Sequence, residues 1–93
     1  GRPSRQLADG SVELDGLLHR DDIKELTGIE LPEGPYATFA GFVISQLGRT
    51  PEVGDSAVAL GHRFTVTEMD GRRVARIRIT PVDDQVDAAT ERA

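Results

Sequence analysis

Thr38-Phe39-Ala40-Gly41-Phe42-Val43-Ile44-Ser45-Gln46-Leu47-Gly48 is the stretch that decides the fold. Its apolar positions 39, 42, 43 and 47 recur with the spacing of one helical face, and positions 40 and 44 are apolar as well. Thr38 is a good N-cap residue and Gly48 a good C-terminal glycine, so the pattern predicts a helix over residues 39–47. A helix that is apolar almost all round must be covered by other elements, so we place it at the centre of the core.

A hairpin and a short helix are expected before this segment. Asp9-Gly10 is a dipeptide typical of type I′ turns, and Val12 and Leu14 alternate with polar residues as in a strand with one wet side. A two-residue turn at that dipeptide places Leu7 opposite Val12 on a shared apolar face. Residues 20–27 predict a first helix, because acidic residues occupy its first turn and a glycine follows its end.

Three strands after the central helix are expected to form an antiparallel meander. They cover residues 56–60, 63–69 and 72–80. The connecting two-residue turns are predicted at Gly61-His62 and Asp70-Gly71. Phe64 then lies opposite Ala59 on one neighbour and opposite Ile77 on the other. Both turns independently place Phe64 on one apolar face, which makes this face the partner of the central helix.

The opposite face of the meander is basic and partly apolar. Its members are Val58, Leu60, Arg63, Arg76 and Arg78. The predicted register places Arg63 opposite Arg78, where like charges are unfavourable. A solvated sheet face is the plainer interpretation of this pattern. The functional interpretation is an interaction face for another domain or subunit, or an anion site formed by Arg63, Arg76 and Arg78.

Composition limits the classes of protein. The 93 residues suffice for one domain with a modest core, and the formal net charge of −5 argues against nucleic acid as a partner. Cysteine is absent, which excludes disulfides, thiol nucleophiles and zinc knuckles. We find neither a membrane-spanning run nor a signal peptide. We expect residues 1–4 to be a linker or tag remnant, residues 5–82 the domain, and residues 83–93 a disordered acidic tail.

Residues for catalysis or metal binding are sparse. His19 and His62 are the only histidines, one near a helix start and one in a predicted turn, and both are expected on the surface. Asp15, Asp21 and Asp22 are weak candidates for a hard cation, because their spacing matches no EF-hand loop and acids are common at helix starts. The chain shows no nucleophile turn and no glycine-rich phosphate loop. We therefore expect no enzymatic activity and assign no metal site.

The order of short motifs resembles a known family. Over residues 7–82 the motifs and their spacing are similar to those of the CorC/HlyC, or transporter-associated, domain. They are Asp9-Gly10-Ser11, Asp15-Gly16, Leu26-Thr27-Gly28, Thr38-Phe39-Ala40-Gly41-Phe42-Val43, Leu47-Gly48-Arg49-Thr50-Pro51, Gly54-Asp55 and Phe64-Thr65-Val66 ahead of Asp70-Gly71. The resemblance agrees with the α+β class expected from the residues, an antiparallel sheet packed on two helices in the order β-β-α-α-β-β-β. It also implies similarity to the FAD-binding/transporter-associated domain-like fold.

The resemblance also implies a setting. Members are cytosolic C-terminal modules of hemolysin-like magnesium and cobalt efflux proteins, behind a transmembrane domain and a pair of CBS domains. We therefore expect a non-catalytic regulatory module on the cytosolic side of the plasma (inner) membrane. It would act by docking on the CBS or transmembrane domains or by self-association as a homodimer, without a cofactor of its own. The alternatives are a module that binds an adenine nucleotide or a flavin such as FAD, and a sensor of divalent cations.

Overall fold

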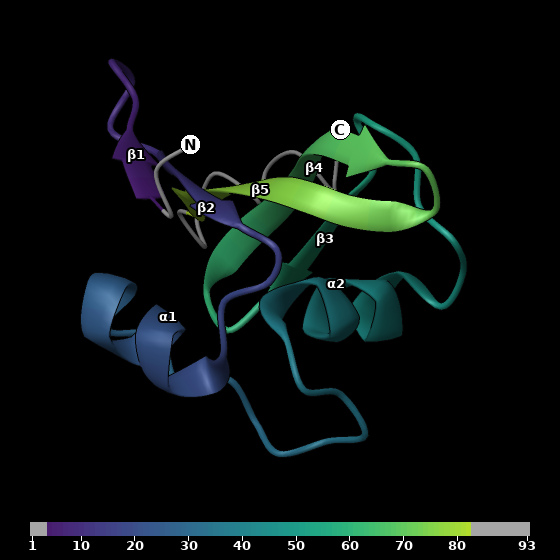
Figure 1. The fold of residues 1–93 in the computed structure, drawn as a ribbon. Helices are drawn as coiled ribbons and strands as arrows, with labels where there is room; N and C mark the ends of the chain where they lie inside the picture. The colour runs from purple at the N-terminus through teal and green to yellow at the C-terminus, as the bar shows by residue number, and fades with distance from the viewer. Residues whose placement is uncertain (1–3, 83–93) are drawn as a thin grey trace, which may run out of the picture.

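The computed structural model describes residues 4–82. They form a five-stranded antiparallel sheet with two helices on one of its faces (Figure 1). In chain order the elements are β1 (Ser4–Gln6), β2 (Val12–Asp15), α1 (Arg20–Thr27), α2 (Phe39–Leu47), β3 (Ser56–Ala59), β4 (His62–Asp70) and β5 (Arg73–Pro81). The predicted α+β class and element order are confirmed. Ser4 already belongs to β1 rather than to a linker, and the tail predicted for residues 83–93 lies outside the described residues.

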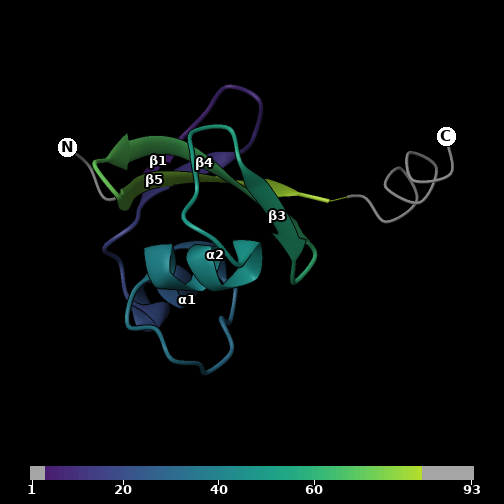
Figure 2. The same cartoon turned by 90° about the vertical axis from the view of Figure 1, so that its right-hand side faces the viewer.

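The strands lie in the order β1-β2-β5-β4-β3, so the last strand of the chain is the middle strand of the sheet. β4 and β5 have nine residues each, whereas the edge strands β1 and β3 have three and four. Both helices pack beneath one face, and no described element lies over the other (Figure 2). We call this uncovered side the outer face.

The central helix α2 is the predicted one, residue for residue. Thr38 accepts a hydrogen bond from the amide of Gly41 through its hydroxyl oxygen (3.3 Å), and Gly48 ends the helix with φ of 74°. Backbone carbonyls fix the start of α2, because Phe39 and Ala40 donate to the carbonyls of residues 18 and 16 at 2.7 and 2.9 Å. The segment between β2 and α1 therefore satisfies amides that a helix cannot satisfy itself.

Three phenylalanines join α2 to the sheet. The ring of Phe64 on β4 makes edge-to-face contacts with Phe39 and Phe42, with centroids 5.8 and 5.5 Å apart. All three rings are at most 1% exposed. Leu14, Ile23, Val43, Val66, Val74 and Ile77 complete the fully buried apolar set. The predicted pairing of α2 with the face that carries Phe64 is confirmed, and this core fixes which sheet face stays open.

Gly41 in α2 lies close to the loop that precedes the helix. A Cβ at Gly41 would lie 2.7 Å from the Cβ of Tyr36 in the preceding loop, not against a strand or the first helix. The tightest backbone approach is instead at Gly16, where a Cβ would overlap the carbonyl oxygen of Val74. The Gly16 amide also donates to the carbonyl of Ala75 (2.9 Å), so the crossover to α1 lies directly against β5.

The turns of the meander lie one residue away from the predicted positions. Leu60-Gly61 connects β3 to β4 with φ of 56° and 75°, so Phe64 pairs with Ala57 rather than Ala59. Gly71 with φ of 61° begins the β4–β5 turn, and Phe64 pairs with Ile79 rather than Ile77. Gly61 occupies the second position of its turn rather than the first, and Gly71 occupies the first position rather than the second. Because both registers shift by two residues, the apolar face is unchanged.

The first hairpin differs from the prediction by one residue. Gln6 pairs with Val12, whereas a two-residue turn would have placed Leu7 there. The loop is longer because the Asp9 carboxylate accepts hydrogen bonds from the amide and the hydroxyl of Ser11 at 3.0 and 2.5 Å. Asp9 therefore organises a local turn of its own instead of a type I′ turn.

Candidate docking face

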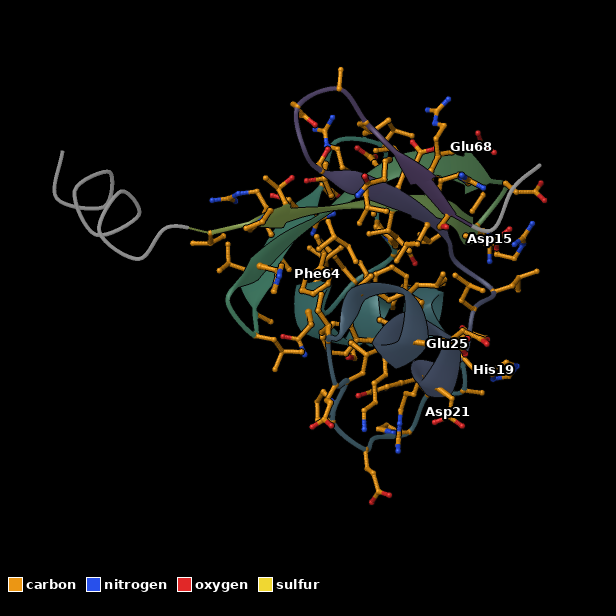
Figure 3. All side chains as sticks on the ribbon, turned by 90° about the vertical axis from the view of Figure 1, so that its left-hand side faces the viewer. Asp15, His19, Asp21, Glu25, Phe64 and Glu68 are labelled. Carbon is orange, nitrogen blue, oxygen red and sulfur yellow. The ribbon has the colours of Figure 1, made fainter. Side chains whose placement is uncertain are left out.

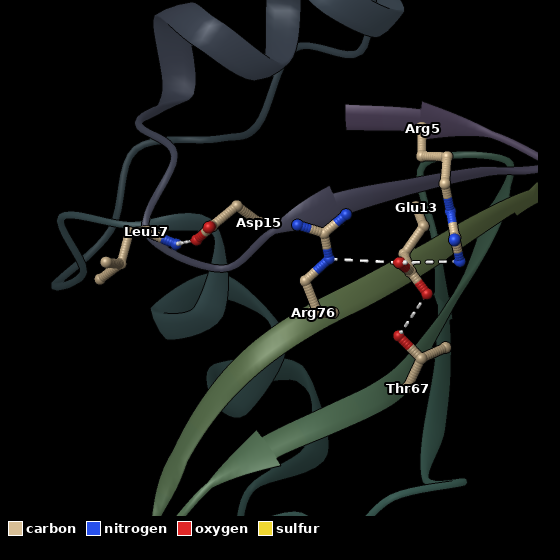
Figure 4. Close-up of polar contacts among 6 residues, drawn as sticks. All are labelled: Arg5, Glu13, Asp15, Leu17, Thr67 and Arg76. Atoms are coloured by element: carbon tan, nitrogen blue, oxygen red, sulfur yellow. Dashed lines mark hydrogen bonds and ion pairs between the residues drawn. The ribbon is translucent and has the colours of Figure 1, made fainter. Parts of the chain in front are cut away.

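Glu13 organises one half of the outer face (Figure 4). One oxygen of its carboxylate accepts from Arg76 Nε at 3.2 Å and from Arg5 at 3.4 Å, and the other accepts from the Thr67 hydroxyl at 3.1 Å. The three partners come from β5, β1 and β4, so a single β2 side chain links four strands. Sequence reasoning did not select Glu13, because nothing in the chain shows that β2 lies beside β5.

Arg76 is therefore not an open anion contact. Its side chain is 15% exposed and is engaged by the equally shielded Glu13. On the neighbouring strands it faces Asp15 and Glu68, both acidic. Of the three arginines predicted to form an anion site, Arg76 instead forms an ion pair that joins β5 to β2.

A cavity of about 520 Å³ opens beside the Glu13–Arg76 pair. It is lined by Arg5, Glu13, Asp15, Leu17, Glu68, Arg73, Ala75 and Arg76. Ala75 faces this side because the β4–β5 ladder is irregular between Val66 and Met69. The guanidinium of Arg73 is paired with Asp70 at 2.8 Å. The size suits a small ligand, but the lining holds three carboxylates beside three arginines, a poor environment for a phosphate.

The other two predicted arginines lie toward the β3–β4 end. Arg63 faces Thr80, and Arg78 faces Thr65 on one side and Glu13 on the other, so the predicted Arg63–Arg78 opposition is wrong. The corrected register separates the like charges with threonines. Within residues 4–82 no carboxylate lies within ion-pair distance of Arg78; its charge acts at longer range on Asp9. The pKa of Asp9 is below its usual value, mainly because of the Ser11 hydrogen bonds, with a smaller contribution from Arg78.

The end of the outer face near the β3–β4 turn is apolar as well as basic. We call Val58, Leu60 and Arg63 together the β3–β4 corner. Val58 is 48% exposed and Leu60 47% exposed. Val58 pairs across the strands with Arg63, which donates to the Ser56 hydroxyl at 3.4 Å. Of the five residues predicted as an interaction face, these three lie at one corner, Arg78 lies beside them, and Arg76 belongs to the Glu13 network.

Leu60 has an unfavourable backbone conformation. Its φ of 56° lies in the left-handed region, and among residues 4–82 it is the only non-glycine residue there. A branched side chain disfavours this region by about 1–2 kcal/mol, and asparagine or glycine is the usual occupant of such a turn position. The fold thus retains an exposed leucine where a polar turn residue would fit better. Strain of this kind is concentrated at functional positions.

The weak metal candidates are not brought together. Asp15 accepts from the amide of Leu17 at 2.8 Å, and Asp22 accepts from the amide of His19 at 3.0 Å to cap α1. Asp21 is exposed on α1, away from Asp15 (Figure 3). In the described part of the chain, no three acidic or histidine side chains are grouped as a metal site requires.

The two histidines contact backbone rather than each other. Nδ1 of His19 lies 2.9 Å from the carbonyl oxygen of Ala37, and Nδ1 of His62 lies 2.9 Å from that of Leu60. His19 is the N-cap residue of α1, and His62 is the first residue of β4. Neither helix in residues 4–82 is long and apolar enough to cross a lipid bilayer.

The fold and the motif order together define a transporter-associated domain. Residues 5–83 match the family CorC_HlyC, the transporter associated domain, and the chain belongs to this family. A UPF0053 protein of Synechocystis is 39% identical over 90 residues, which are 92% of this chain and 20% of that protein. The polyamine export protein of Escherichia coli K12 is 29% identical over 88% of this chain and 17% of its own length. The magnesium and cobalt efflux protein CorC of Vibrio cholerae is 28% identical over 85% of this chain and 27% of its own length.

Solved structures agree with the assignment. The transporter-associated domain of a Xylella fastidiosa hemolysin, solved in complex with Mg++ and Mn++, is 30% identical with a TM-score of 0.76, covering 88% of this chain and all of that one. The transporter-associated domain of a CBS domain protein from Porphyromonas gingivalis is 32% identical with a TM-score of 0.74 at the same coverage. The chain spans about a fifth of the length of the curated relatives that it matches. It therefore corresponds to one domain of those longer proteins.

Proposed function

We propose that this domain is a non-catalytic regulatory module that docks on another protein surface through the β3–β4 corner. The observation that carries the proposal is Leu60, an exposed leucine kept in the left-handed conformation. A solvated turn gains nothing from a leucine there, whereas a docking surface gains an apolar contact. The neighbouring Val58 extends the apolar area and Arg63 adds a positive charge, so the partner surface is expected to be apolar and acidic.

The partner is expected within the same longer protein. The relatives are about five times the length of this chain, and one solved relative is described as part of a CBS domain protein. We therefore infer docking on CBS or membrane-embedded domains of a parent protein on the cytosolic side of the plasma (inner) membrane. Because relatives are named for polyamine export and for magnesium and cobalt efflux, the regulated process is export of a cation. Self-association through the same corner is the competing arrangement.

The decisive experiment uses Leu60→Asn. Asparagine tolerates the left-handed region, so this variant should fold and be more stable by about 1 kcal/mol. Titration calorimetry would compare its affinity for the CBS polypeptide encoded upstream in the same reading frame with that of the original chain. We expect at least a tenfold loss, since a well-packed apolar anchor contributes more than about 1.4 kcal/mol.

Leu26→Asn is the matched control, because Leu26 is also 47% exposed but lies on α1 beneath the other face. Its affinity should be unchanged. Equal affinities for Leu60→Asn and the original chain would contradict the proposal. Sedimentation of the chain alone tests self-association. If the chain forms a dimer and Leu60→Asn dissociates it, the partner at the corner is a second copy of this chain and not a CBS domain.

Binding of an adenine nucleotide or flavin is a second candidate, supported by the size of the 520 Å³ cavity. Each of its three arginines pairs with a carboxylate, so a phosphate would have to break ion pairs on entry. Calorimetric titration of the chain with ATP, AMP and FAD tests it. Absence of heat at millimolar ligand would reject this candidate and leave the docking proposal untouched.

A further inference from the structure

The acidic segment formed by residues 83–93 starts beside the β3–β4 corner. β5 ends at Pro81, which pairs with His62, and the amide of Val82 donates to the carbonyl of Gly61 at 3.0 Å. Gly61 follows Leu60 in the β3–β4 turn. The chain therefore leaves the described structure next to the surface that the proposed function uses.

The charge of the acidic segment is complementary to this part of the outer face. Its sequence Asp-Asp-Gln-Val-Asp-Ala-Ala-Thr-Glu-Arg-Ala holds four carboxylates against one guanidinium. The nearest outer-face cations are Arg63 and Arg78, and Arg78 has no carboxylate within ion-pair distance in residues 4–82. Between its acids the segment also carries Val86, an apolar side chain that suits the exposed Val58 and Leu60.

Reach is not a constraint. Eleven residues extend up to about 36 Å at roughly 3.3 Å each, and the longest dimension of the domain is 36 Å. The first acids of the segment, Asp83 and Asp84, follow Val82 directly in the sequence. Arg63 lies one residue pair, and Arg78 three residue pairs, before the last pair of β5.

We infer that the acidic segment docks on the chain's own outer face at the β3–β4 corner and competes there with an external partner. The competition rests on the proposed function, whereas the docking of the segment does not. An intramolecular occupant has a high effective concentration, so weak exposed ion pairs suffice to reduce the apparent affinity for a competitor. The chain thus carries a salt-sensitive internal competitor for its docking face.

The absence of cysteine makes a direct test possible. Ala88→Cys in the 93-residue chain, labelled with a nitroxide, would broaden the amide NMR signals of any surface that the segment touches. We expect broadening centred on Val58, Leu60 and Thr65 and none on Leu26 of α1. Raising the salt from 0.01 M to 1 M shortens the Debye length from about 30 Å to about 3 Å and should abolish it.

Two sets of variants test which charges hold the acidic segment on the outer face. Asp83→Asn/Asp84→Asn/Asp87→Asn changes only the charge of the acidic segment and should remove the broadening. Arg78→Gln should weaken it, whereas Arg72→Gln makes the same charge change in the turn at the other end of β4 and should not. Uniform broadening, broadening of another surface, or broadening that persists in 1 M salt and in the triple variant would overturn the inference.

The calorimetric assay with the upstream CBS polypeptide separates the two proposals. If the segment competes, the triple variant should bind that polypeptide roughly three- to tenfold more tightly, as expected for the loss of two or three exposed ion pairs. Unchanged affinity would overturn the competition. Absence of broadening together with a weakened Leu60→Asn variant would retain the docking module and reject the internal competitor. Corner broadening with Leu60→Asn binding like the original chain would retain the self-docking and reject the docking module.

Discussion

Among residues 4–82, Glu13 and Arg76 form the most shielded ion pair of the outer face, with each side chain 15% exposed and 3.2 Å between Oε1 and Nε. The pair joins β2 to β5, two strands that are more than sixty residues apart in the chain. Arg5 and Thr67 bind the same carboxylate, so the network spans the sheet from its β1 edge to β4. The pair therefore stabilises the association of β2 with its neighbouring strands. The residues of this network form one part of the outer face, and the β3–β4 corner forms another.

Replacing Glu13 should destabilise the fold. Glu13→Gln keeps the shape but removes the charge that the partly shielded Arg76 contacts, and we expect a loss of about 1–3 kcal/mol in the free energy of unfolding. Urea denaturation measures it. Glu68→Gln is the control, since Glu68 also faces Arg76 but is exposed, and its change should stay within about 0.5 kcal/mol. Similar losses in both variants would show that the Glu13 contacts contribute little.

Gly16 is the position where a methyl group is least tolerable. In Gly16→Ala the new Cβ would overlap the Val74 carbonyl oxygen, whose strand is held by neighbours on both sides. A loss above about 3 kcal/mol is expected, which is a large share of the stability of a domain of this size. Gly41→Ala should cost less, because it meets Tyr36 in a loop and gains about 1 kcal/mol of helix propensity. Thermal denaturation of both variants ranks them, and the reverse order would refute this packing.

The contribution of the α2 N-cap to stability can be tested by removing the hydroxyl group of Thr38. Thr38→Ala removes the hydroxyl that accepts from the Gly41 amide and should lower the free energy of unfolding by about 0.5–2 kcal/mol. Thr38→Ser keeps the hydroxyl and should retain most of the stability. Chemical denaturation of the two variants decides; an equal loss would indicate that the threonine methyl group, not the cap, is what matters.

The Arg49–Asp55 pair predicts a pH dependence of stability. The hydrogen bond from Arg49 (2.9 Å), and next the Glu52 amide, hold the pKa of Asp55 below its ordinary value of 3.8. A lowered folded-state pKa contributes stability above the unfolded-state value, and this contribution is lost as the pH falls through the folded-state value. The Tm advantage of the original chain over Asp55→Asn should therefore be present at pH 7 and disappear well below pH 3.8.

Arg49→Gln should reproduce most of the neutral-pH loss, and combining it with Asp55→Asn should add little, because both remove the same interaction. A Tm difference that is constant from pH 7 down to strongly acidic pH would rule out this contribution.

Local signals made the helices predictable. Thr38, Gly48 and the apolar spacing between them define α2 without reference to the rest of the chain, and its bounds are confirmed. The turn positions were less predictable, because a glycine fits either central position of a tight turn and Leu60 adopts a conformation that its side chain disfavours. Errors of two in register preserve the faces, which is why the core was predictable although the pairs were not.

The candidate site was only partly predictable. Val58, Leu60 and Arg63 follow from strand alternation alone, and they do lie together at one corner. Arg76 was assigned to the same face correctly, but its engagement by Glu13 depends on β2 lying beside β5, a contact between distant parts of the chain that no local pattern reveals.

The middle position of β5 has a consequence for how the domain is made. β2 pairs with β5 through Val12 and Ile79, so strands at opposite ends of the domain meet only after nearly all of it has been synthesised. During translation the β1–β2 hairpin and both helices emerge first, with the apolar side of α2 still lacking the sheet that covers it. The ribosome must release β5 before the core can close, and until then that apolar surface stays exposed, which is the condition under which a nascent chain is prone to aggregate.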